Sequence, residues 1–468
     1  MKNTKSCFVL FSFYDRTGIE AYLEKQAEKG WLLDKVSATG WHFHRIEPQK
    51  LHFSVVYFAK ASSFDPEPSE EQLSFQDFCE HTGWNLAASN AQMQIFYNEA
   101  ADPTPIETDA CLDVAAIHAS AKKSHLPTAC LLTFTGLFQM LIYMFRFLTD
   151  PVRILTSNND LFIGICWLLM LTLSLGEIVS YYSWHRRAQK AAELDGSFVE
   201  TNGHPYFKII LIGIIIGAYV FLLFANNNSR LSLIAVASIV IVIGLTAILL
   251  GISEWMKKLK ISANANRNIT IILTLFTSFS VAGLLIIGIV IISDSIFPEK
   301  TPVATYEVNG WTHRLYQDEL PLRAEDLFET DYDNYSYEIQ SQDKSFLAER
   351  MEASQQPCID ALNQPRLDYT IITTEIPFLY KFFKNTTLEN FADNEGYPET
   401  DGVIWEEPVA IDAAPWNAVE AYQLRLGDEY DTRFILCYER CIVELDINCD
   451  VELTDTHKKI IGEKLGAR

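Results

Sequence analysis

Three histidines near the N-terminus have the spacing of a metal site. His42 and His44 alternate along one predicted strand, so both imidazoles point to one face of a sheet. His52 opens the next strand and would join them if the hairpin register allows it. Three imidazoles on one face would suit zinc or copper. The alternative is a polar, solvent-facing sheet surface, which we favour because no carboxylate or cysteine lies nearby at ligand spacing.

Glu177 is an acidic residue well inside a long apolar run, Leu173-Ser-Leu-Gly-Glu-Ile-Val. A carboxylate at that depth in a membrane is costly, and it usually marks a pathway or an ion pair. The nearest basic candidate is Lys208, at the inner end of the next apolar run. We therefore expect Glu177 either to extend to the interface or to pair with Lys208, which would hold the two runs together.

Other candidate chemistry is sparse. The loop Phe64-Asp-Pro-Glu-Pro68 is stiffened by two prolines, and it either presents two carboxylates to a partner or serves as a rigid connector. No nucleotide-binding, nucleophile-elbow or zinc-protease motif occurs, so no catalytic residue and no cofactor site is predicted. The sequence leans away from an enzyme, although a site scattered along the chain stays open as an alternative.

Charge is strongly segregated along the chain. Residues 294–468 carry 15 Lys and Arg against 36 Asp and Glu, whereas residues 127–293 have a net charge of +4. Binding to nucleic acid needs a basic face, so the acidic C-terminal third and the total charge of −23 argue against a nucleic-acid partner.

Five apolar runs predict an all-α, five-helix membrane region over residues 126–293. Each run is long enough to cross a hydrocarbon core of about 30 Å at about 1.5 Å per residue. The predicted spans are Leu126–Leu148, Leu161–Tyr182, Tyr206–Ala225, Leu231–Ile252 and Ile269–Ile292. The sequence therefore predicts a multi-pass protein of the cell membrane, with the lipid bilayer as its first partner.

The loops between the spans predict the orientation. Basic residues gather before the first span, between the second and third, and between the fourth and fifth, at Lys122, Lys123, Arg186, Arg187, Lys190, Lys208, Lys257, Lys258, Lys260 and Arg267. Because basic loops stay on the cytoplasmic side, residues 1–125 are predicted to be cytoplasmic and residues 294–468 extracytoplasmic.

The N-terminal domain, residues 1–125, reads as a duplicated αββ unit. Gly30-Trp31-Leu32-Leu33 matches Gly83-Trp84-Asn85-Leu86 at an offset of 53 positions. In each half a predicted helix, 17–29 or 69–82, precedes a Gly-Trp corner and a pair of strands. We expect an α+β sandwich of ferredoxin-like type with both helices on one face of one sheet. Residues 7–14 are predicted to be its first strand.

Several motifs in this region resemble a known family. They are Phe11-Ser-Phe-Tyr-Asp15, Gly30-Trp31, Leu51–Tyr57, Phe64–Pro68 and Phe78-Cys-Glu-His-Thr-Gly-Trp84. Over residues 5–110 the chain is similar to a family of bacterial membrane proteins known only as a domain of unknown function, whose members are commonly encoded beside PadR-type transcriptional regulators. The resemblance implies a role near regulation or envelope response, and it implies no catalytic residue.

The acidic C-terminal domain, residues 294–468, reads as a second α+β domain. Strands are predicted at 367–375, 421–426 and 433–447, the last as a hairpin that turns near Glu439, and a closing helix at 454–465. Its four cysteines, Cys358, Cys437, Cys441 and Cys449, are expected to be buried free thiols. Disulfides stay open as the alternative, because the number is even and the compartment is predicted to be oxidising, but Cys437 and Cys441 are too far apart along one strand to bridge each other.

Three functions compete. The first is a membrane sensor or regulatory protein that couples an envelope signal to a cytosolic regulatory protein, since a soluble domain is predicted on each side of the membrane. The second is a transporter or its accessory subunit, although a single deep carboxylate offers little to line a polar path. The third, a membrane enzyme, has no residues to support it.

Overall fold

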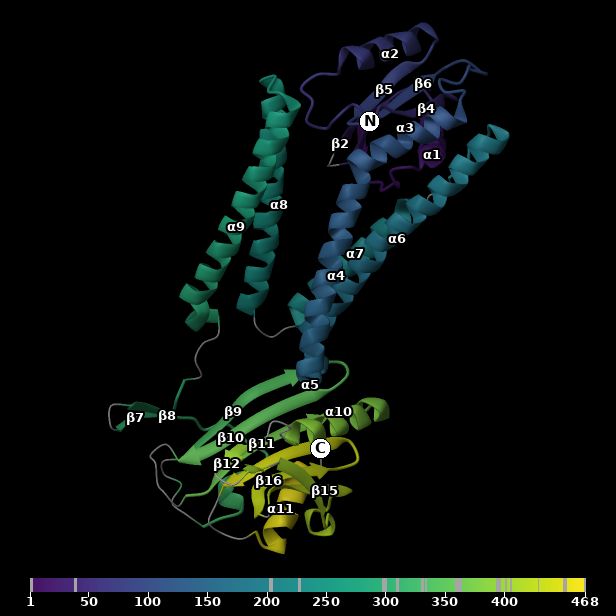
Figure 1. Cartoon of the computed structure of the whole chain (residues 1–468). Coiled ribbons are helices and arrows are strands. Elements are labelled where there is room, and N and C mark those ends of the chain that lie inside the picture. The colour runs from purple at the N-terminus through teal and green to yellow at the C-terminus, as the bar shows by residue number, and fades with distance from the viewer. Residues whose placement is uncertain are drawn as a thin grey trace. The chain divides into compact units, whose positions relative to one another are not determined.

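The chain is a mixed α+β protein in which, along the sequence, an N-terminal region of strands and helices is followed by long helices and then by a C-terminal region rich in strands (Figure 1). It divides into two compact units, residues 1–140 with 166–296 and residues 141–165 with 297–468, which are described one at a time. The computed structural model describes residues 3–37, 40–201, 205–225, 229–296, 301–308, 311–329, 332, 335–357, 364–392, 397–399, 402–404, 406–427, 429–448 and 453–466.

The N-terminal part of the first unit contains the same βαββ arrangement twice. The first copy is β1 (Thr4–Cys7), α1 (Arg16–Glu28), β2 (Trp31–Ser37) and β3 (Gly40–Arg45). The second copy is β4 (His52–Tyr57), α2 (Glu70–His81), β5 (Asn85–Asn90) and β6 (Met93–Asn98). Both predicted helices and five of the predicted strands, β2 to β6, are confirmed. The strand that opens the first copy, β1, is shorter and lies earlier than the strand predicted at 7–14.

The duplication extends to the details of the backbone. Each copy forms an antiparallel sheet in which the last strand is central, with orders β1-β3-β2 and β4-β6-β5. A β-bulge follows Leu33 in β2, and another follows the equivalent Leu86 in β5. The helices end at Gly30 and Gly83, whose φ angles of 78° and 89° lie in the left-handed region that favours glycine. The predicted repeat is therefore confirmed.

The prediction of one ferredoxin-like sheet with both helices on one face is wrong. The strands pair in two sheets, whose edge strands β2 and β5 lie against each other. Along β6, Ile95 belongs to the core that contains α1, whereas its neighbour Phe96 packs with Cys79 of α2. Successive strand residues point to opposite faces, so α1 and α2 cover opposite faces of the β4-β6-β5 sheet.

The predicted strand at residues 7–14 is also wrong. Pairing between β1 and β3 ends at Cys7, which faces Trp41, and β3 begins at Gly40. The chain beyond Cys7 has no further partner in that sheet. Its apolar side chains, including Val9 and Phe11, are instead buried or half-buried in the core without forming a strand.

Helices occupy all five of the predicted apolar runs. They are α3 (Ala110–Lys123), α4 (His125–Thr149), α5 (Pro151–Thr156), α6 (Asn158–Asp195), α7 (Pro205–Ala225), α8 (Ser229–Lys258) and α9 (Ala263–Ile296), of which α3 and α5 lie outside those runs. Two of them, α4 and α6, are long and apolar enough to cross a membrane, among the residues that the structure describes. Little of either apolar stretch is buried within the protein.

The second unit is built on a seven-stranded antiparallel sheet of order β14-β15-β16-β17-β11-β10-β9. Its strands are β9 (Tyr335–Lys344), β10 (Glu349–Pro357), β11 (Arg366–Thr373), β14 (Glu406–Ile411), β15 (Glu420–Leu426), β16 (Glu429–Cys437) and β17 (Cys441–Asn448). Two short hairpins, β7 (Ala304–Val308) with β8 (Trp311–Leu315) and β12 (Tyr397–Glu399) with β13 (Gly402–Ile404), stand apart from it. The predicted strands and the β16–β17 hairpin are confirmed.

The two faces of this sheet differ. One face is apolar and packs against helix α11 (Asp455–Leu465), which was predicted at 454–465 and is capped by Thr454. The other face has an apolar end, where Ile372 and Ile442 pack against Phe383 of α10 (Pro377–Phe391). The thiols of Cys437 and Cys441 are buried and form no disulfide among the described residues, whereas Cys358 and Cys449 lie outside those residues.

Candidate functional site

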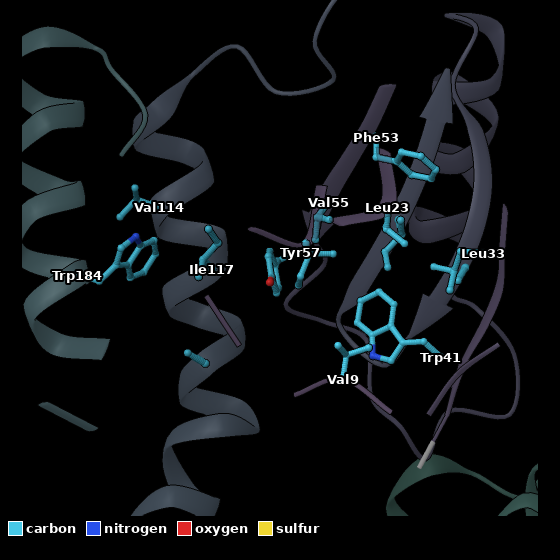
Figure 2. Close-up of a cluster of buried hydrophobic side chains, with 14 of the residues drawn as sticks. Val9, Leu23, Leu33, Trp41, Phe53, Val55, Tyr57, Val114, Ile117 and Trp184 are labelled. Atoms are coloured by element: carbon cyan, nitrogen blue, oxygen red, sulfur yellow. The ribbon is translucent and has the colours of Figure 1, made fainter. Parts of the chain in front are cut away.

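The last turns of α6 are built into the core of the N-terminal domain. Trp184 is 4% exposed and belongs to the same buried cluster as Leu23 of α1 and Tyr57 of β4. Figure 2 shows α3 between them, with Val114 on the side of Trp184 and Ile117 on the side of Tyr57. The long apolar helix and the folded domain therefore share one hydrophobic core.

Glu177 lies one to two helical turns before this core and contacts the N-terminal segment. Its Oε1 accepts a hydrogen bond of 3.2 Å from the hydroxyl of Ser12, and its Oε2 is 3.9 Å from Nε2 of His125. His125 begins α4 and stacks on Phe13, with ring centroids 5.6 Å apart. The predicted partner Lys208 has a side chain outside the described residues, so that pairing stays a prediction.

A histidine pair lies about two helical turns after Glu177, in the contact region between α6 and the N-terminal domain, which we call the joint. The rings of His118 in α3 and His185 in α6 stack at 4.0 Å with an interplanar angle of 5°. Nδ1 of His118 is 2.7 Å from the hydroxyl of Tyr181. Burial, with the charges of His185 and Lys122, lowers the pKa of His118. At neutral pH the stack therefore consists of uncharged imidazoles, which can lie face to face without repulsion.

Tyr14 of the N-terminal segment packs against the same part of α6. Its ring stacks on Trp184 at 5.0 Å. Burial, and next the negative charge of Glu177, raises the pKa of the Tyr14 phenol. The Phe11-Ser-Phe-Tyr-Asp15 segment thus places a phenol, a hydroxyl and an aromatic ring against the helices that leave the domain.

A buried ion pair stabilises the domain side of the joint. Arg16 at the start of α1 donates a 2.7 Å hydrogen bond to Asp113 of α3, and its Nε is 3.7 Å from Glu20. Glu20 also accepts a 2.9 Å hydrogen bond from the backbone N–H of Val55 in β4. These contacts hold α1, α3 and β4 together around one guanidinium group.

Glu20 is nevertheless hard to ionise. Burial raises the pKa of its carboxyl to about 7, against the opposing effects of Arg16 and of the Val55 hydrogen bond. Burial also raises the pKa of Asp113. The charge of this cluster therefore changes close to neutral pH, which makes the packing between α1 and α3 sensitive to protons.

The structure does not bring the three predicted metal ligands together. His42 and His44 lie on β3, in the β1-β3-β2 sheet, whereas His52 lies on β4 in the other sheet. The hairpin that would have joined them does not form, because β4 pairs with β6 instead of β3.

Each of these histidines has another polar neighbour. The ring of His42 lies 2.8 Å from the hydroxyl of Ser6 and 2.9 Å from that of Ser37. His44 and His52 lie near carboxylates, at 3.8 and 3.9 Å from Asp34 and Glu24. In the described part of the chain no group of three or more His, Cys, Asp or Glu side chains is placed to hold a metal ion.

Sequence reasoning missed the histidines of the joint, although a signal was present. Glu177, Tyr181 and His185 are spaced four positions apart, so they share one face of α6. A polar and aromatic stripe at the end of an otherwise apolar helix indicates a contact with a folded domain. The partners Ser12 and His118 could not be identified, because they are brought there by tertiary packing.

Comparisons with known proteins give one match. Residues 15–127 match a family model described as "Protein of unknown function (DUF2812)". No curated protein and no solved structure matches the chain. The matched segment begins at Asp15, the cap of α1, and ends at the start of α4, so it contains Arg16, Glu20 and His118 but not the α6 side of the joint. Residues 15–127 are therefore a DUF2812 domain of unknown function.

Proposed function

We propose that this chain is a membrane-anchored sensor or regulatory protein that couples a signal in its C-terminal domain to a cytosolic regulatory partner of its N-terminal domain. One observation carries the proposal: the inner turns of α6, including Tyr181 and Trp184, are part of the hydrophobic core of the DUF2812 domain. A helix that ends in a domain core cannot shift without repacking that core, because close-packed interiors do not deform continuously.

The opposite parts of the same helices support the proposal. Residues 141–165, which include the end of α4, helix α5 and the start of α6, belong to the unit that contains the seven-stranded sheet. Val152 of α5 is buried with Ile372 and Phe383. The hydroxyl of Ser345 donates a 2.6 Å hydrogen bond to the carbonyl of Leu155. Helices α4 and α6 thus contribute Leu126 and Trp184 to the first core, and the short helix α5 between them in sequence contributes Val152 to the second.

The cellular setting is part of the proposal. The apolar surfaces of α4 and α6 favour a lipid bilayer as their surroundings, and large exposed side chains such as Phe134, Phe145 and Leu148 are costly in water. The distribution of Lys and Arg between the apolar runs favours a cytoplasmic DUF2812 domain and an extracytoplasmic acidic domain.

The experiment compares two tryptophan variants in full-length protein purified from native membranes. Trp184 is 4% exposed in the shared core, whereas Trp255 of α8 is 60% exposed, so Trp255→Ala is the matched control. Hydrogen exchange should increase in α1 and α3 for Trp184→Ala alone, because removal of a buried Trp destabilises its surroundings by about 3–5 kcal/mol.

The same purified proteins test whether a soluble regulatory protein binds the N-terminal domain. A soluble regulatory protein should co-purify with wild type and with Trp255→Ala, and its yield should change with Trp184→Ala. Co-purification of other membrane subunits alone, with no soluble protein, would contradict the sensor and favour the accessory subunit of a transporter. Unchanged exchange in α1 and α3 would contradict the coupling.

A further inference from the structure

Three large apolar side chains are exposed at one end of the seven-stranded sheet. Phe346, in the turn between β9 and β10, is 74% exposed. Ile376 and Phe378, just before α10 and in its first turn, are 36% and 76% exposed. We call these three residues the apolar rim. Side chains of this size are costly in water when they lie together, so the first question is whether they form one surface.

Hydrogen bonds hold the two parts of the apolar rim side by side. The hydroxyl of Thr374 donates a 2.8 Å hydrogen bond to the carbonyl of Leu347 in the β9–β10 turn. The same hydroxyl oxygen accepts a 3.2 Å hydrogen bond from the N–H of Ile376. The register agrees, because the first residue of β10 pairs with the last residues of β9 and of β11. The apolar rim is therefore one surface formed by two neighbouring connections.

The β9–β10 turn is bonded to the beginning of the apolar helix α6. The backbone N–H of Phe346 donates a 3.2 Å hydrogen bond to the side-chain oxygen of Asn158. The side-chain amide of Asn158 donates one of 3.2 Å to the carbonyl of Lys344. Asn158 is the first residue of α6. These two bonds fix the turn, and Phe346 with it, at the start of that helix.

An ion pair marks the level at which the apolar helices would leave the hydrocarbon core. Arg146, near the end of α4, is 3.0 Å from Asp160 in the first turn of α6. Charged groups are costly inside the hydrocarbon core, so this pair belongs at its boundary. Asp160 is two positions from Asn158, which is about 3 Å along the helix axis. Phe346 is therefore attached at the depth of the boundary.

The α10 part of the apolar rim is attached to α4 at the same level. The ring of Phe382 in α10 stacks on that of Phe147 in α4, with centroids 6.2 Å apart and an interplanar angle of 10°. Phe147 directly follows Arg146 of the ion pair. Phe378 lies four positions before Phe382, about one turn away along α10. Both parts of the rim thus lie beside the ends of the apolar helices.

The charges beside the apolar rim also suit a lipid surface. Lys381, one turn after Phe378, and Arg153 in α5 are exposed, and among the described residues neither forms an ion pair. Glu375, which directly precedes the rim residue of the β11–α10 connection, is paired with Arg440 at 2.6 Å. Within a strongly acidic domain, this end therefore presents two exposed cations, and basic residues beside apolar ones are typical of proteins that contact a membrane surface.

We propose that the C-terminal domain rests on the lipid bilayer through the apolar rim, with Phe346 and Phe378 inserted between the headgroups and the acyl chains and with Lys381 and Arg153 near the phosphate groups. The contact involves the folded domain itself and not only the helices that would cross the bilayer. It rests on the membrane setting proposed above for α4 and α6, and it does not depend on the coupling to a cytosolic partner.

Photochemical crosslinking in the full-length protein tests the contact. The photoreactive residue p-benzoylphenylalanine replaces one aromatic side chain at a time, and the protein is placed in nanodiscs of phosphatidylcholine and phosphatidylglycerol that contain a trace of fluorescent phospholipid. After irradiation, the lipid fluorescence attached to the protein should be at least fivefold greater for Phe346 and Phe378 than for the control, Tyr430.

Tyr430 is a matched control because it is an exposed aromatic residue at the other end of the sheet. It is 57% exposed, near the start of β16. Cys437, at the end of the same strand, is buried in one cluster with Val152 of α5. Seven positions separate the two residues of β16, which is about 23 Å along the strand. Tyr430 therefore lies far from the apolar rim while being similar to it in exposure.

A position within the apolar stretch of α4 separates this inference from the membrane setting. Phe134 is 67% exposed, so lipid should be attached there whenever α4 crosses the bilayer. Lipid attached at Phe134 but at neither Phe346 nor Phe378 would overturn the contact and leave the membrane setting intact. Lipid attached at none of the three would overturn both. A crosslink from the rim to a second copy of the chain in place of lipid, or equal labelling at Tyr430, would also overturn the contact.

The two cations are tested with a choice of labelled lipid. With fluorescent phosphatidylglycerol, which is anionic, Lys381→Gln together with Arg153→Gln should reduce attachment at Phe378 at least twofold. With fluorescent phosphatidylcholine, which has no net charge, the same pair of substitutions should leave attachment unchanged. An equal loss with both lipids would show that the substitutions displace the domain, and no loss with either would overturn the role given to the cations.

Discussion

The hydroxyl of Ser12 donates a 3.2 Å hydrogen bond to the carboxylate of Glu177, although 165 positions separate the two residues. Ser12 belongs to the irregular segment before α1, and Glu177 belongs to the apolar helix α6. The sequence left two expectations for a carboxylate in this apolar run, extension to the interface or an ion pair with Lys208. In the structure Glu177 contacts Ser12 of the N-terminal segment and lies near His125 at the start of α4, and the pairing with Lys208 stays a prediction.

Replacement of Glu177 tests how much its contacts with Ser12 and His125 stabilise the protein. Glu177→Gln keeps an oxygen that can accept from Ser12 and loses only the charge beside His125. Polar contacts between membrane helices average about 0.6 kcal/mol, so the variant should insert and melt like wild type. Glu177→Leu removes the acceptor and should increase hydrogen exchange in the segment around Ser12. A misfolded Glu177→Gln protein would show that the charge itself is structural.

Glu20 should make the stability of the first unit depend on pH. Its pKa rises from 4.5 to about 7 on folding, so the folded state binds more protons between these values. The contribution of Glu20 to stability is therefore fully present below pH 4.5 and decreases as pH rises toward 7, by about 3 kcal/mol at most. Glu20→Gln should raise the melting temperature at pH 8 and have little effect at pH 5.

Thermal melts of the full-length protein in one detergent at pH 5, 6, 7 and 8 measure this difference. Glu28→Gln, at the exposed end of α1, is the control and should follow wild type at every pH. The raised pKa of Asp113 acts in the same direction, so Glu20→Gln should reduce the pH dependence without removing it. A Glu20→Gln protein that is less stable than wild type at pH 8 would contradict the assignment.

Gly136 should be required for the packing of α4 against α6. A Cβ atom at this position would lie 3.2 Å from Cα and Cβ of Leu171, whereas one at Gly176 would meet nothing within 4 Å. Gly136→Leu should therefore destabilise the helix pair by about 1–3 kcal/mol. Gly176→Leu adds the same side chain to open space and should melt within about 0.5 kcal/mol of wild type. Equal melting of the two variants would rule out this close contact.

The orientation in the membrane is tested with fused reporters. A reporter that is active only outside the cytoplasm should work after Arg468 and fail before Met1, because the basic loops favour a cytoplasmic N-terminus. A cytoplasmic reporter should give the opposite pattern. Activity of the first reporter at the N-terminus would reverse the assignment of the two domains, and activity at both ends would point to an even number of spans.

The secondary structure could be predicted well because it depends on local patterns. Ser69 caps α2 by accepting from the N–H of Gln72, at the start of the helix predicted at 69–82. The placement of the helices could not be predicted, because β4 and β6 are apolar on both faces. Val55 and Ile95 face one core, whereas Val56 and Phe96 face another. Such strands do not reveal which helix covers which side.

The candidate sites could be predicted less well than the fold, because they are formed by tertiary structure. The histidine alternation in β3 was correct, but the metal site failed because His52 is in another sheet. The pairing of Asp368 with Asp446 in the sheet of the second unit is likewise a matter of register between distant strands. Nothing in the local sequence of β11 or β17 specifies it.

The contact between β2 and β5 has a consequence for the symmetry of the domain. These strands occupy the same place in the two βαββ copies, and each has a bulge at the same position. Contact between equivalent surfaces is what joins two identical chains in a symmetric dimer. The domain therefore has the organisation of a symmetric dimer contained within one chain, with β2 and β5 in the place of the dimer interface.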